Sequence, residues 1–380
     1  MDFNNVLKLM VQKKASDLFV ITGVAPSMKV DGRLIPISKA KLNEEQCQEL
    51  ILGLMDPGQR EEFQSTKECN FAIGRAEIGR FRVSAYVQRG SAAMVVRRIE
   101  SKIPSFDDLK LPPIVGDLAM TKRGLIIFVG ATGTGKSTSL ASMVGYRNQN
   151  SSGHIITIED PVEFTHYHSG CIVSQREVGV DTESFEVALK NTLRQAPDVI
   201  LIGEIRTRQT MENALIFAET GHLCLATLHA NNANQAIDRI INFFPEEARE
   251  QAFMDLSLNL RGVIAQQLVR TVDGKGRRAA LEILINTPLA SDIIRKGEVH
   301  KLKDLMKRSN EQGMVTFDQA LYSLYVEGTI SYEDALRSAD SPNEVRLMIK
   351  LNSSDEDQLN NDIGGISLMD GDDFGSDSKF

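Results

Sequence analysis

Residues 125–137 read Leu-Ile-Ile-Phe-Val-Gly-Ala-Thr-Gly-Thr-Gly-Lys-Ser, a short apolar run that leads directly into a glycine-rich segment. The segment 130–137 matches the phosphate-binding P-loop pattern G-x-x-x-x-G-K-[ST]. The apolar run predicts a strand and residues 138–147 predict a helix, so the pattern has the strand–loop–helix context that a P-loop requires. We therefore expect a nucleotide-binding α/β domain. A plain glycine-rich turn before a helix is the alternative.

Each residue type in this segment has a chemical reason to be there. Glycines let backbone N–H groups curl around phosphate oxygens, and the helix N-terminus adds partial positive charge. Lys136 brings a positive charge to the β- and γ-phosphates, and Ser137 offers a hydroxyl to Mg²⁺. The predicted nucleotide-binding residues are Gly130, Ala131, Thr132, Gly133, Thr134, Gly135, Lys136, Ser137 and Thr138.

The sequence around the P-loop predicts a parallel sheet. Three further short runs, at 155–158, 199–202 and 223–228, are dominated by apolar residues, and helical stretches separate them. Apolar runs that alternate with helices are typical of parallel strands covered on both faces. Residues 246–350 are predicted to be mostly helical.

An acidic cluster, Glu159-Asp-Pro-Val-Glu163, follows the strand predicted at 155–158. In an open parallel sheet, the carboxyl end of a strand faces the ligand cleft. We interpret Glu163 as a group that polarises the attacking water, and Glu159 and Asp160 as candidates for the Mg²⁺ shell. A charged strand-to-loop turn without a catalytic role is the alternative.

Two more candidates follow neighbouring apolar runs. Glu204 ends the run Val199-Ile-Leu-Ile-Gly-Glu, which has the form of a Walker B strand with Gly-Glu where Asp is common. It is a candidate for a water-mediated Mg²⁺ contact, and a helix-capping acid is the alternative. His229 follows the run 223–228 and can sense the γ-phosphate by hydrogen bonding; a structural histidine is the alternative. The predicted catalytic set is Glu163, Glu204 and His229, and the predicted Mg²⁺ set is Ser137, Glu204, Glu159 and Asp160.

Arginines form a further candidate group, because an arginine near a γ-phosphate stabilises the charge of the transition state. Arg82 and Arg97 belong to predicted strands near the N-terminus, and Arg194 and Arg206 flank the Walker B run. These four are the arginine candidates. Arg80 and Arg98 lie on the same predicted strands, and a solvated strand face is the alternative for at least two of these arginines.

The first hundred residues, roughly, have a different pattern, typical of an antiparallel α+β domain. Helices are predicted at 3–11 and 43–55, and strands at 18–21, 28–30, 33–35, 79–88 and 94–99. Residues 103–113 contain three prolines, which favour extended backbone over helix. We therefore expect an N-terminal domain at 1–102, a Pro-rich linker at 103–113, the nucleotide-binding domain with its helical C-terminal part at 114–350, and a tail at 351–380.

The formal net charge of −8 comes mainly from the C-terminal tail. Residues 353–380 hold eight acids against one base, Lys379, a net charge of −7, so residues 1–352 carry −1. Positive and negative charges nearly cancel in residues 1–352, and this part has no long basic run, which argues against a nucleic-acid partner. The tail is rich in Ser, Asp, Gly and Asn, and we expect it to be disordered. It is either a dispensable solvated segment or a contact for a basic partner surface.

The remaining composition favours a cytoplasmic protein. No stretch approaches the roughly 18 uncharged apolar residues of a membrane span, and the N-terminus lacks the basic and apolar regions of a signal peptide. The cysteines lie far apart without a C-x-x-C pair, which excludes a disulfide framework and the usual zinc ribbon. They are Cys47, Cys69, Cys171 and Cys224. We expect all four to be buried and reduced.

Four segments in order resemble the boxes of the secretion and type IV pilus ATPases. They are Gly130-Ala-Thr-Gly-Thr-Gly-Lys-Ser-Thr138 (Walker A), Ile156-Thr-Ile-Glu-Asp-Pro-Val-Glu-Phe164 (Asp box), Leu193-Arg-Gln-Ala-Pro-Asp-Val-Ile-Leu-Ile-Gly-Glu-Ile-Arg206 (Walker B), and Ala218-Glu-Thr-Gly-His222 with Ala226-Thr-Leu-His229 (His box). The resemblance covers residues 1–350. Four ordered boxes are far less expected by chance than any one of them.

Within that superfamily the chain is similar to the pilus-retraction branch, the PilT/PilU family. Extension and type II secretion ATPases generally carry a larger N-terminal region and a four-cysteine zinc module, and this sequence shows neither. The stretch Leu289-Ala-Ser-Asp-Ile-Ile-Arg-Lys-Gly-Glu298 departs from the PilT motif Ala-Ile-Arg-Asn-Leu-Ile-Arg-Glu. That departure and the acidic tail favour the accessory PilU type.

The resemblance implies a RecA-like P-loop ATPase domain, a PAS-like N-terminal domain and a homohexameric ring that uses ATP and Mg²⁺. It places Glu163 on the family's catalytic glutamate and Glu204 on its Walker B glutamate. It makes Arg82 and Arg97 the arginines that reach nucleotide in a cleft between the two domains, with the linker 103–113 as the hinge. The implied partners are a PilT-type retraction ATPase and the pilus platform protein, at the cytoplasmic face of the inner membrane.

Several functions remain open at this stage. The leading one is a Mg²⁺-dependent ATPase motor for pilus retraction and twitching motility, acting as a PilT-dependent accessory. The second is a low-activity nucleotide-binding subunit that stabilises a PilT motor, although a scaffold needs no catalytic acid such as Glu163. A pilus extension or type II secretion ATPase is the third. DNA translocation is a distant fourth, since RecA-like rings also move nucleic acid.

Overall fold

The computed structural model describes residues 2–30, 32–75, 78–100 and 102–352. Its chain divides into two units, Met1–Leu268 with Leu281–Thr316, and Val269–Ala280 with Phe317–Phe380. The acidic tail expected at 351–380 lies outside the described residues, except for its first two positions, which end a helix. The domain boundaries expected at 102/103 and 113/114 remain predictions.

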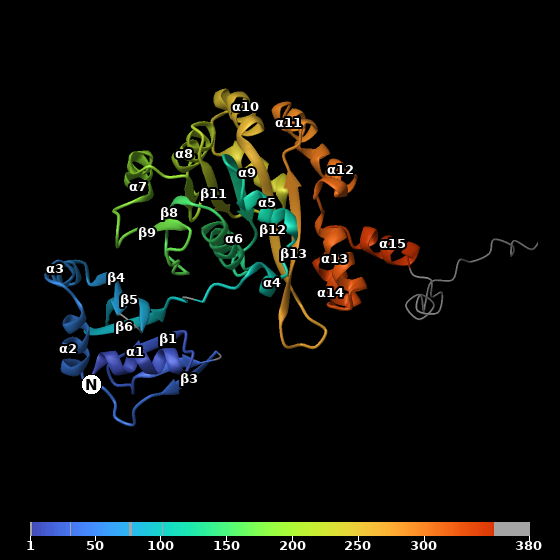
Figure 1. Ribbon diagram of the computed structural model, residues 1–380. Helices are drawn as coiled ribbons and strands as arrows, with labels where there is room; N and C mark the ends of the chain where they lie inside the picture. Colours follow the sequence, from blue (N-terminus) through green and yellow to red (C-terminus); the bar gives the residue numbers. More distant parts are fainter. Residues whose placement is uncertain (1, 31, 76–77, 101, 353–380) are drawn as a thin grey trace, which may run out of the picture. The chain divides into compact units, whose positions relative to one another are not determined.

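The N-terminal part of the first unit contains a six-stranded sheet in the order β3-β2-β1-β6-β5-β4 (Figure 1). All neighbouring strands pair antiparallel, as the sequence predicts. The strands are β1 (Asp17–Val20), β2 (Ser27–Val30), β3 (Arg33–Pro36), β4 (Glu68–Arg75), β5 (Gly79–Gln88) and β6 (Ser91–Arg98), and the helices are α1 (Phe3–Gln12), α2 (Glu44–Leu54) and α3 (Pro57–Thr66). In β5, Phe81, Val83 and Ala85 alternate into the core. The sequence analysis missed α3 and β4. Helix α3 buries only Phe63, so it has little apolar periodicity to detect.

The Pro-rich segment is not fully extended, which corrects one expectation. A short helix, α4 (Phe106–Leu109), begins with a capping box in which Ser105 and Asp108 exchange side-chain hydrogen bonds with each other's backbone N–H. The Phe106 ring stacks on Tyr146 with centroids 4.6 Å apart. Helix α5 (Pro113–Ala119) follows and has Pro113 in its first turn, where the missing N–H costs nothing.

The nucleotide-binding part is built on a seven-stranded sheet in the order β13-β12-β7-β11-β10-β8-β9. Its strands are β7 (Gly124–Val129), β8 (Gly153–Glu159), β9 (Cys171–Glu177), β10 (Val199–Ile202), β11 (Leu223–Leu228), β12 (Leu260–Arg270) and β13 (Arg277–Ile285). The pairs from β12 through β7, β11, β10 and β8 to β9 are parallel. This confirms the α/β class with its parallel sheet. Every residue of β7, β10 and β11 is buried, which explains their unbroken apolar sequences.

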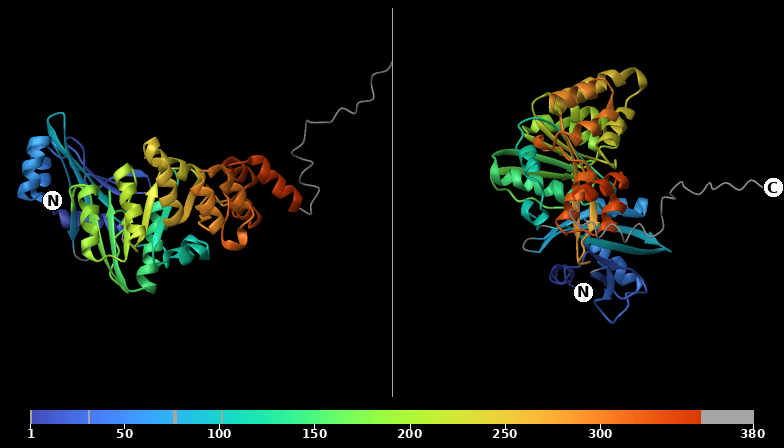
Figure 2. Two further views of the ribbon diagram at one scale, coloured as in Figure 1. Left: turned by 90° about the horizontal axis from the view of Figure 1, so that it is seen from above. Right: turned by 90° about the vertical axis from the view of Figure 1, so that its right-hand side faces the viewer.

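Helices lie on both faces of this sheet (Figure 1, Figure 2). They are α6 (Lys136–Asn150), α7 (Phe185–Thr192), α8 (Arg208–Glu219), α9 (Ala233–Asn242), α10 (Arg249–Asn259), α11 (Pro288–Arg295) and α12 (Leu302–Lys307), with 3-10 turns at Leu193–Gln195, Glu246–Ala248, Val299–Lys301 and Asn310–Gln312. Because β7, β8, β10 and β11 are parallel, their carboxyl ends meet at one edge of the sheet. That edge holds the P-loop and the acidic segments.

The expectation of a mostly helical 246–350 is wrong for β12 and β13. The pair Gln266-Gln267 and the flanking arginines interrupt the apolar run of β12, so its sequence lacks the clear signal of the other strands. Pairing with β7, a non-local contact, makes this segment a strand.

The second unit contains the last residues of β12, from Val269, and the first residues of β13, up to Ala280. It also contains the helices α13 (Phe317–Val326), α14 (Tyr332–Ser338) and α15 (Pro342–Asn352). The three helices contact one another around buried Leu321, Leu324, Ala335 and Val345.

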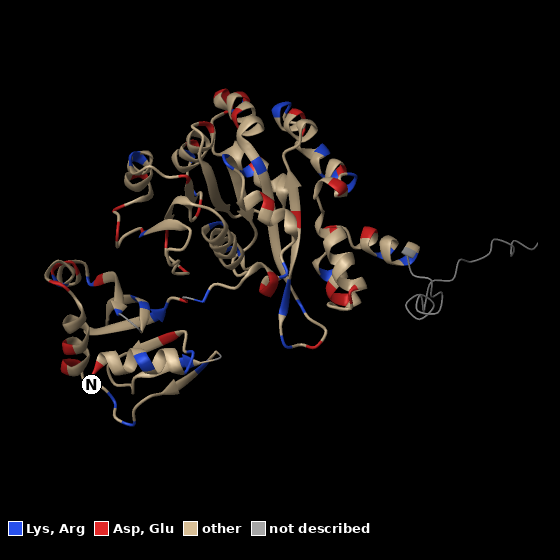
Figure 3. Cartoon of the chain, in the orientation of Figure 1, with Lys and Arg blue, Asp and Glu red and all other residues tan. Residues whose placement is uncertain are grey.

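Charges and cysteines follow the expectations from composition. Lys and Arg are interspersed with Asp and Glu along the drawn ribbon (Figure 3). All four cysteines are free and buried. Within the described ranges, no helix has both the length and the apolar character needed to cross a membrane.

Candidate functional site

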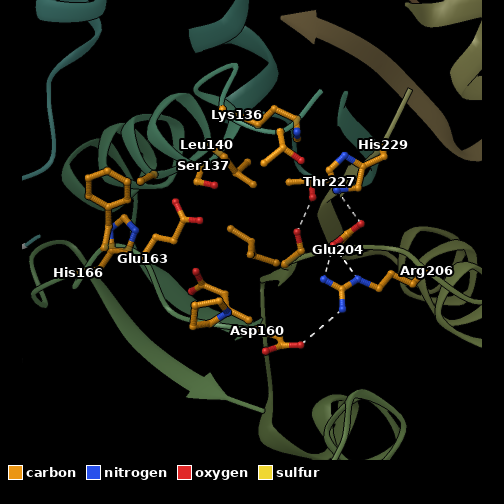
Figure 4. A pocket seen from close by; sticks show the side chains of 18 residues that line it. Lys136, Ser137, Leu140, Asp160, Glu163, His166, Glu204, Arg206, Thr227 and His229 are labelled. Carbon is orange, nitrogen blue, oxygen red and sulfur yellow. Dashed lines mark hydrogen bonds and ion pairs between the residues drawn. The ribbon is translucent and has the colours of Figure 1, made fainter. Parts of the chain in front are cut away.

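A cavity of about 330 Å³ opens at the carboxyl edge of the parallel sheet (Figure 4). The P-loop, the segment after β8, and the ends of β10 and β11 each contribute side chains to it. Its lining includes Thr132, Gly133, Lys136, Ser137, Leu140, Ala141, Glu159, Asp160, Pro161, Glu163, Phe164, His166, Leu201, Gly203, Glu204, Arg206, Thr227 and His229. The fold thus brings together the predicted catalytic set, the predicted Mg²⁺ set and four of the predicted P-loop residues.

Glycine is required at two P-loop positions for different reasons. At Gly130, φ is 151°, and an added Cβ would lie 2.5 Å from the Gln266 carbonyl oxygen. At Gly135, φ is 84°, and this residue caps the N-terminus of α6 in the left-handed region. The loop therefore passes close to β12 and then turns into the helix, a path that a larger residue would distort.

Lys136 closes over this loop. Its Nζ donates to the carbonyl oxygens of Gly130, at 2.7 Å, and Ala131, at 2.9 Å. Burial lowers the pKa of Lys136, and the carboxylates of Glu204 and Glu163 oppose that shift. The ammonium is therefore held at the P-loop and faces two acids across the cavity.

Gln266 supports the P-loop from β12, a role that the sequence analysis missed. Its side chain is buried, and Nε2 donates to the Thr134 carbonyl oxygen at 2.8 Å. Its Oε1 is buried without a hydrogen-bond partner. The signal for this residue was a polar side chain inside an apolar run, but its significance depends on β12 lying beside β7.

Glu204 pairs with two of the predicted residues. Its Oε1 lies 3.1 Å from His229 Nε2, and its Oε2 lies 2.7 Å from the Arg206 guanidinium (Figure 4). Arg206 also reaches Asp160 at 3.6 Å. The hydrogen bond to Glu204 is the main reason that the pKa of Arg206 is raised. Since both carboxylate oxygens of Glu204 are held, its orientation toward the cavity is fixed.

The structure also explains the unusual Gly-Glu ending of the Walker B run. A Cβ at Gly203 would lie 2.9 Å from Glu159 Cα and 3.2 Å from the Ile158 carbonyl oxygen. The backbone of β8 is therefore too close for any side chain here. Thr227 Oγ1 donates to the Gly203 carbonyl oxygen from the other side, at 2.5 Å.

Glu159, the last residue of β8, lines the cavity together with Glu163 and His166 from the segment that follows. Burial raises the pKa of Glu159 to about 7, against hydrogen bonds from Thr157 and Gln175. Glu163 is exposed. Burial lowers the pKa of His166 to about 4, so this ring is neutral near pH 7. His166 was not among the predicted site residues. The stretch Thr165-His-Tyr-His168 offers two histidines, but no acid or thiol stands at ligand spacing to predict a metal site.

The residues of the cavity fit Mg²⁺ bound together with a nucleotide. Over the described ranges, no three His, Cys, Asp or Glu side chains are arranged to hold a metal ion by themselves. At phosphate sites, Mg²⁺ takes one or two protein oxygens and fills its other positions with phosphates and water. The Ser137 hydroxyl and the Glu204 carboxylate supply such oxygens beside the P-loop. Glu159 and Asp160 line the same cavity.

The four arginine candidates lie in different places. Arg206 lines the cavity. Arg82 on β5 lies 3.8 Å from Glu177, and Arg97 on β6 pairs with Asp17 at 2.9 Å. Arg194 is exposed in the 3-10 turn Leu193–Gln195. Among these four, the geometry joins Arg206 alone to the acids of the site.

Comparison with known proteins agrees with this geometry. A family model described as type II/IV secretion system protein matches residues 2–293. The chain is 65% identical to the type IV pilus ATPase PilU of Pseudomonas aeruginosa over 381 aligned residues, which cover 100% of both chains. It is 39% identical to the type IV pilus retraction ATPase PilT of the same organism, over 90% of this chain and 99% of that protein.

A solved structure extends the similarity to three dimensions. The crystal structure of the pilus retraction motor PilT with bound ADP matches with a TM-score of 0.85 and 40% identity, over 92% of this chain and 100% of that chain. The fold, the P-loop and the ordered acidic and histidine segments lead to the same assignment. The chain therefore belongs to the type II/IV secretion system protein family, as a P-loop ATPase of its PilT/PilU branch of type IV pilus ATPases.

Proposed function

We propose that this protein is a Mg²⁺-dependent ATPase that hydrolyses ATP to ADP and phosphate as a homohexameric motor for type IV pilus retraction and twitching motility. The observation that carries the proposal is the arrangement of Glu204. It is held by His229 and Arg206 and shares one cavity with Lys136 and Ser137. The same cavity also presents Glu163, a catalytic acid that a protein which only binds nucleotide would not need.

Each residue has a distinct part in the proposed reaction. The P-loop N–H groups and Lys136 bind the phosphates, and Ser137 and Glu204 are the groups that would hold Mg²⁺. When bound, Mg²⁺ neutralises the charge that develops on the phosphate oxygens. Glu163, which is exposed at the cavity, polarises the attacking water. His229 and Arg206 keep Glu204 in place, and Arg206 is the best-placed of the four arginines. That Arg82, Arg97 and Arg194 reach the nucleotide remains a prediction.

The assembly and partners are proposed from the relatives. PilU is named as a type IV pilus ATPase and PilT as a retraction ATPase. We place this chain beside a PilT-type ATPase, as its accessory, at the pilus platform protein on the cytoplasmic face of the inner membrane. The antiparallel N-terminal sheet with its helices is proposed to be a PAS-like domain.

The linker 103–113 is proposed as the hinge of the motor. Phe106 stacks on Tyr146 of α6, and this contact attaches the linker to the nucleotide-binding part from Phe106 onward. We therefore expect the backbone to bend before Ser105. Replacing the linker with a stiff spacer should abolish twitching motility and leave nucleotide binding intact. Unchanged motility would contradict the hinge.

The alternative is a nucleotide-binding subunit that hydrolyses little ATP and stabilises a PilT motor. A pilus extension or type II secretion ATPase remains a further candidate, but the sequence lacks the zinc module typical of that group. ATP hydrolysis by the purified protein distinguishes the first two functions. The assay compares wild type, Glu163→Gln and Glu183→Gln with Mg²⁺, each with and without a PilT partner.

Glu183 is an exposed acid outside the cavity, which makes it a matched control. Clear hydrolysis by wild type and Glu183→Gln that disappears in Glu163→Gln would support the motor. Negligible hydrolysis by wild type with intact ATP binding, in the presence of the PilT partner as well, would favour the partner-subunit function.

A further inference from the structure

Glu177, the last residue of β9, is a buried acid outside the cavity that the proposed reaction does not use. Its side chain is 0% exposed. Its Oε2 accepts a hydrogen bond from the Val162 N–H at 3.3 Å, and its Oε1 is buried without any hydrogen-bond partner. A buried carboxylate is costly unless it is paired. Such a group therefore needs an explanation.

One side of Glu177 faces the segment that carries Glu163. Val162, which donates to Glu177, immediately precedes Glu163 in the chain and is itself buried. The backbone also joins the two strands here, because Val178 N–H donates to the Glu159 carbonyl oxygen at 2.9 Å. The Glu177 carboxylate is thus one of the contacts that set the position of the 160–163 segment.

The other side of Glu177 faces two arginines of β5. Arg82 Nε lies 3.8 Å from Oε1, the oxygen that has no hydrogen-bond partner. Two residues earlier on the same strand face, Arg80 pairs with Asp181 at 3.2 Å, and Asp181 accepts the Glu177 backbone N–H at 2.9 Å. Two ion pairs therefore join β5 to Glu177 at the end of β9 and to Asp181 in the turn that follows it.

We propose that Glu177 is a positioning residue for ATP hydrolysis: Arg82 on β5 holds its carboxylate, and the carboxylate holds the Val162 N–H and so places Glu163. Displacement of β5 would then be transmitted to the water-polarising group through one buried side chain. This inference rests on the proposed role of Glu163. It gives Arg82 a function that needs no contact with the nucleotide.

The test measures kcat and KM for ATP, ADP affinity and ADP-binding stoichiometry on the full chain. The variants are Glu177→Gln, Arg82→Gln and the double variant. The amide introduced by Glu177→Gln would keep an acceptor for the Val162 N–H but lose the charge that attracts Arg82. We expect each single variant to lower kcat about tenfold, with KM and ADP affinity within about twofold of wild type. The double variant should be no slower than either single variant, because both changes break the same ion pair.

Three outcomes would overturn the inference. Multiplied losses in the double variant would mean that Arg82 acts elsewhere, for example on the nucleotide. A rise in KM with unchanged kcat would mean that the pair affects binding alone. A kcat loss explained entirely by a lower ADP-binding stoichiometry would reduce Glu177 to a structural role.

Two controls keep this test separate from the proposed function. Arg75→Gln removes an arginine of the same sheet that bonds to Asn4, and it should leave kcat unchanged. Glu163→Gln is assayed in parallel. If Glu163→Gln is fully active, the proposed role of Glu163 fails. If it is inactive while Glu177→Gln matches wild type, only the positioning role fails.

Discussion

Glu204 Oε1 lies 3.1 Å from His229 Nε2, where the neighbouring strands β10 and β11 both end. The sequence places these residues 25 positions apart, and the parallel pairing of the two strands brings them together. With Arg206 on its other oxygen, Glu204 cannot rotate without losing a charged partner. The acid that we propose to act near Mg²⁺ is therefore oriented before nucleotide binds.

The first prediction concerns this orientation. His229→Ala should lower kcat for ATP hydrolysis about tenfold, because Glu204 loses the partner of one oxygen, while ADP affinity changes less than about twofold. His300→Gln, which changes an exposed histidine of the turn Val299–Lys301, is the control and should keep wild-type kcat. Steady-state kinetics and ADP titration check both. Equal losses in the two variants would show that the effect does not come from the contact between His229 and Glu204.

The second prediction concerns Gly203. An alanine Cβ here would lie 2.9 Å from Glu159 Cα, so the ends of β8 and β10 must separate. Gly203→Ala should lower the free energy of unfolding by about 1–3 kcal/mol and abolish hydrolysis by displacing Glu204. Gly53→Ala, in helix α2 with nothing near the new methyl group, should instead stabilise the protein by about 0.5–1 kcal/mol. Chemical denaturation and an ATPase assay measure both effects. Normal activity in Gly203→Ala would show that the close approach is not needed.

The third prediction concerns the support of the P-loop. Gln266→Leu removes the 2.8 Å hydrogen bond to the Thr134 carbonyl oxygen but fills a similar volume. We expect ATP and ADP to bind about three- to tenfold more weakly, because the loop loses a contact that fixes its path. Gln64→Leu, at an exposed position of α3, should not alter affinity. Nucleotide titration measures both, and unchanged affinity in Gln266→Leu would remove Gln266 from the site.

The fourth prediction concerns pH. Burial lowers the pKa of His166 to about 4 from an ordinary value of 6.5. Above about pH 6.5 the ring is neutral in the folded and unfolded chains alike. As the pH falls from there toward 4, the unfolded chain takes up a proton that the folded chain does not, so the free energy of unfolding decreases, by up to about 3 kcal/mol.

His166→Gln should remove this part of the acid sensitivity. Denaturation between pH 7 and pH 4.5, without nucleotide, should show a smaller loss of stability for this variant than for wild type. His300→Gln changes an exposed histidine of the turn Val299–Lys301 and should keep the wild-type slope. If the free energy of unfolding falls equally steeply with decreasing pH in wild type and His166→Gln, His166 is not the source of the acid sensitivity.

Sequence patterns alone located the parts of the fold that depend on local chemistry. The P-loop, the strands at 125–129, 155–158, 199–202 and 223–228, and the short strands β2 and β3 were all predicted at or near their observed bounds. A strand buried on both faces needs an unbroken apolar run, and a P-loop needs its glycines, lysine and serine in fixed order. These requirements fall within short stretches, so they are visible without the fold. The ordered boxes likewise sufficed for the family.

Tertiary structure decided the features that join distant parts of the chain. Strands β12 and β13 have mixed polar and apolar sequences. Segment β12 becomes a strand by pairing with β7, more than 100 residues earlier, and β13 lies next to β12 in the same sheet. Three further contacts depend on the order and packing of the strands. Gln266 donates to the P-loop, Arg206 and His229 hold Glu204, and Arg82 faces Glu177. Gly203 has no special conformation, and its need for glycine comes entirely from the backbone of β8. Local propensity cannot predict these contacts, because the stabilising energy of each contact arises between residues that become neighbours only after the sheet has formed.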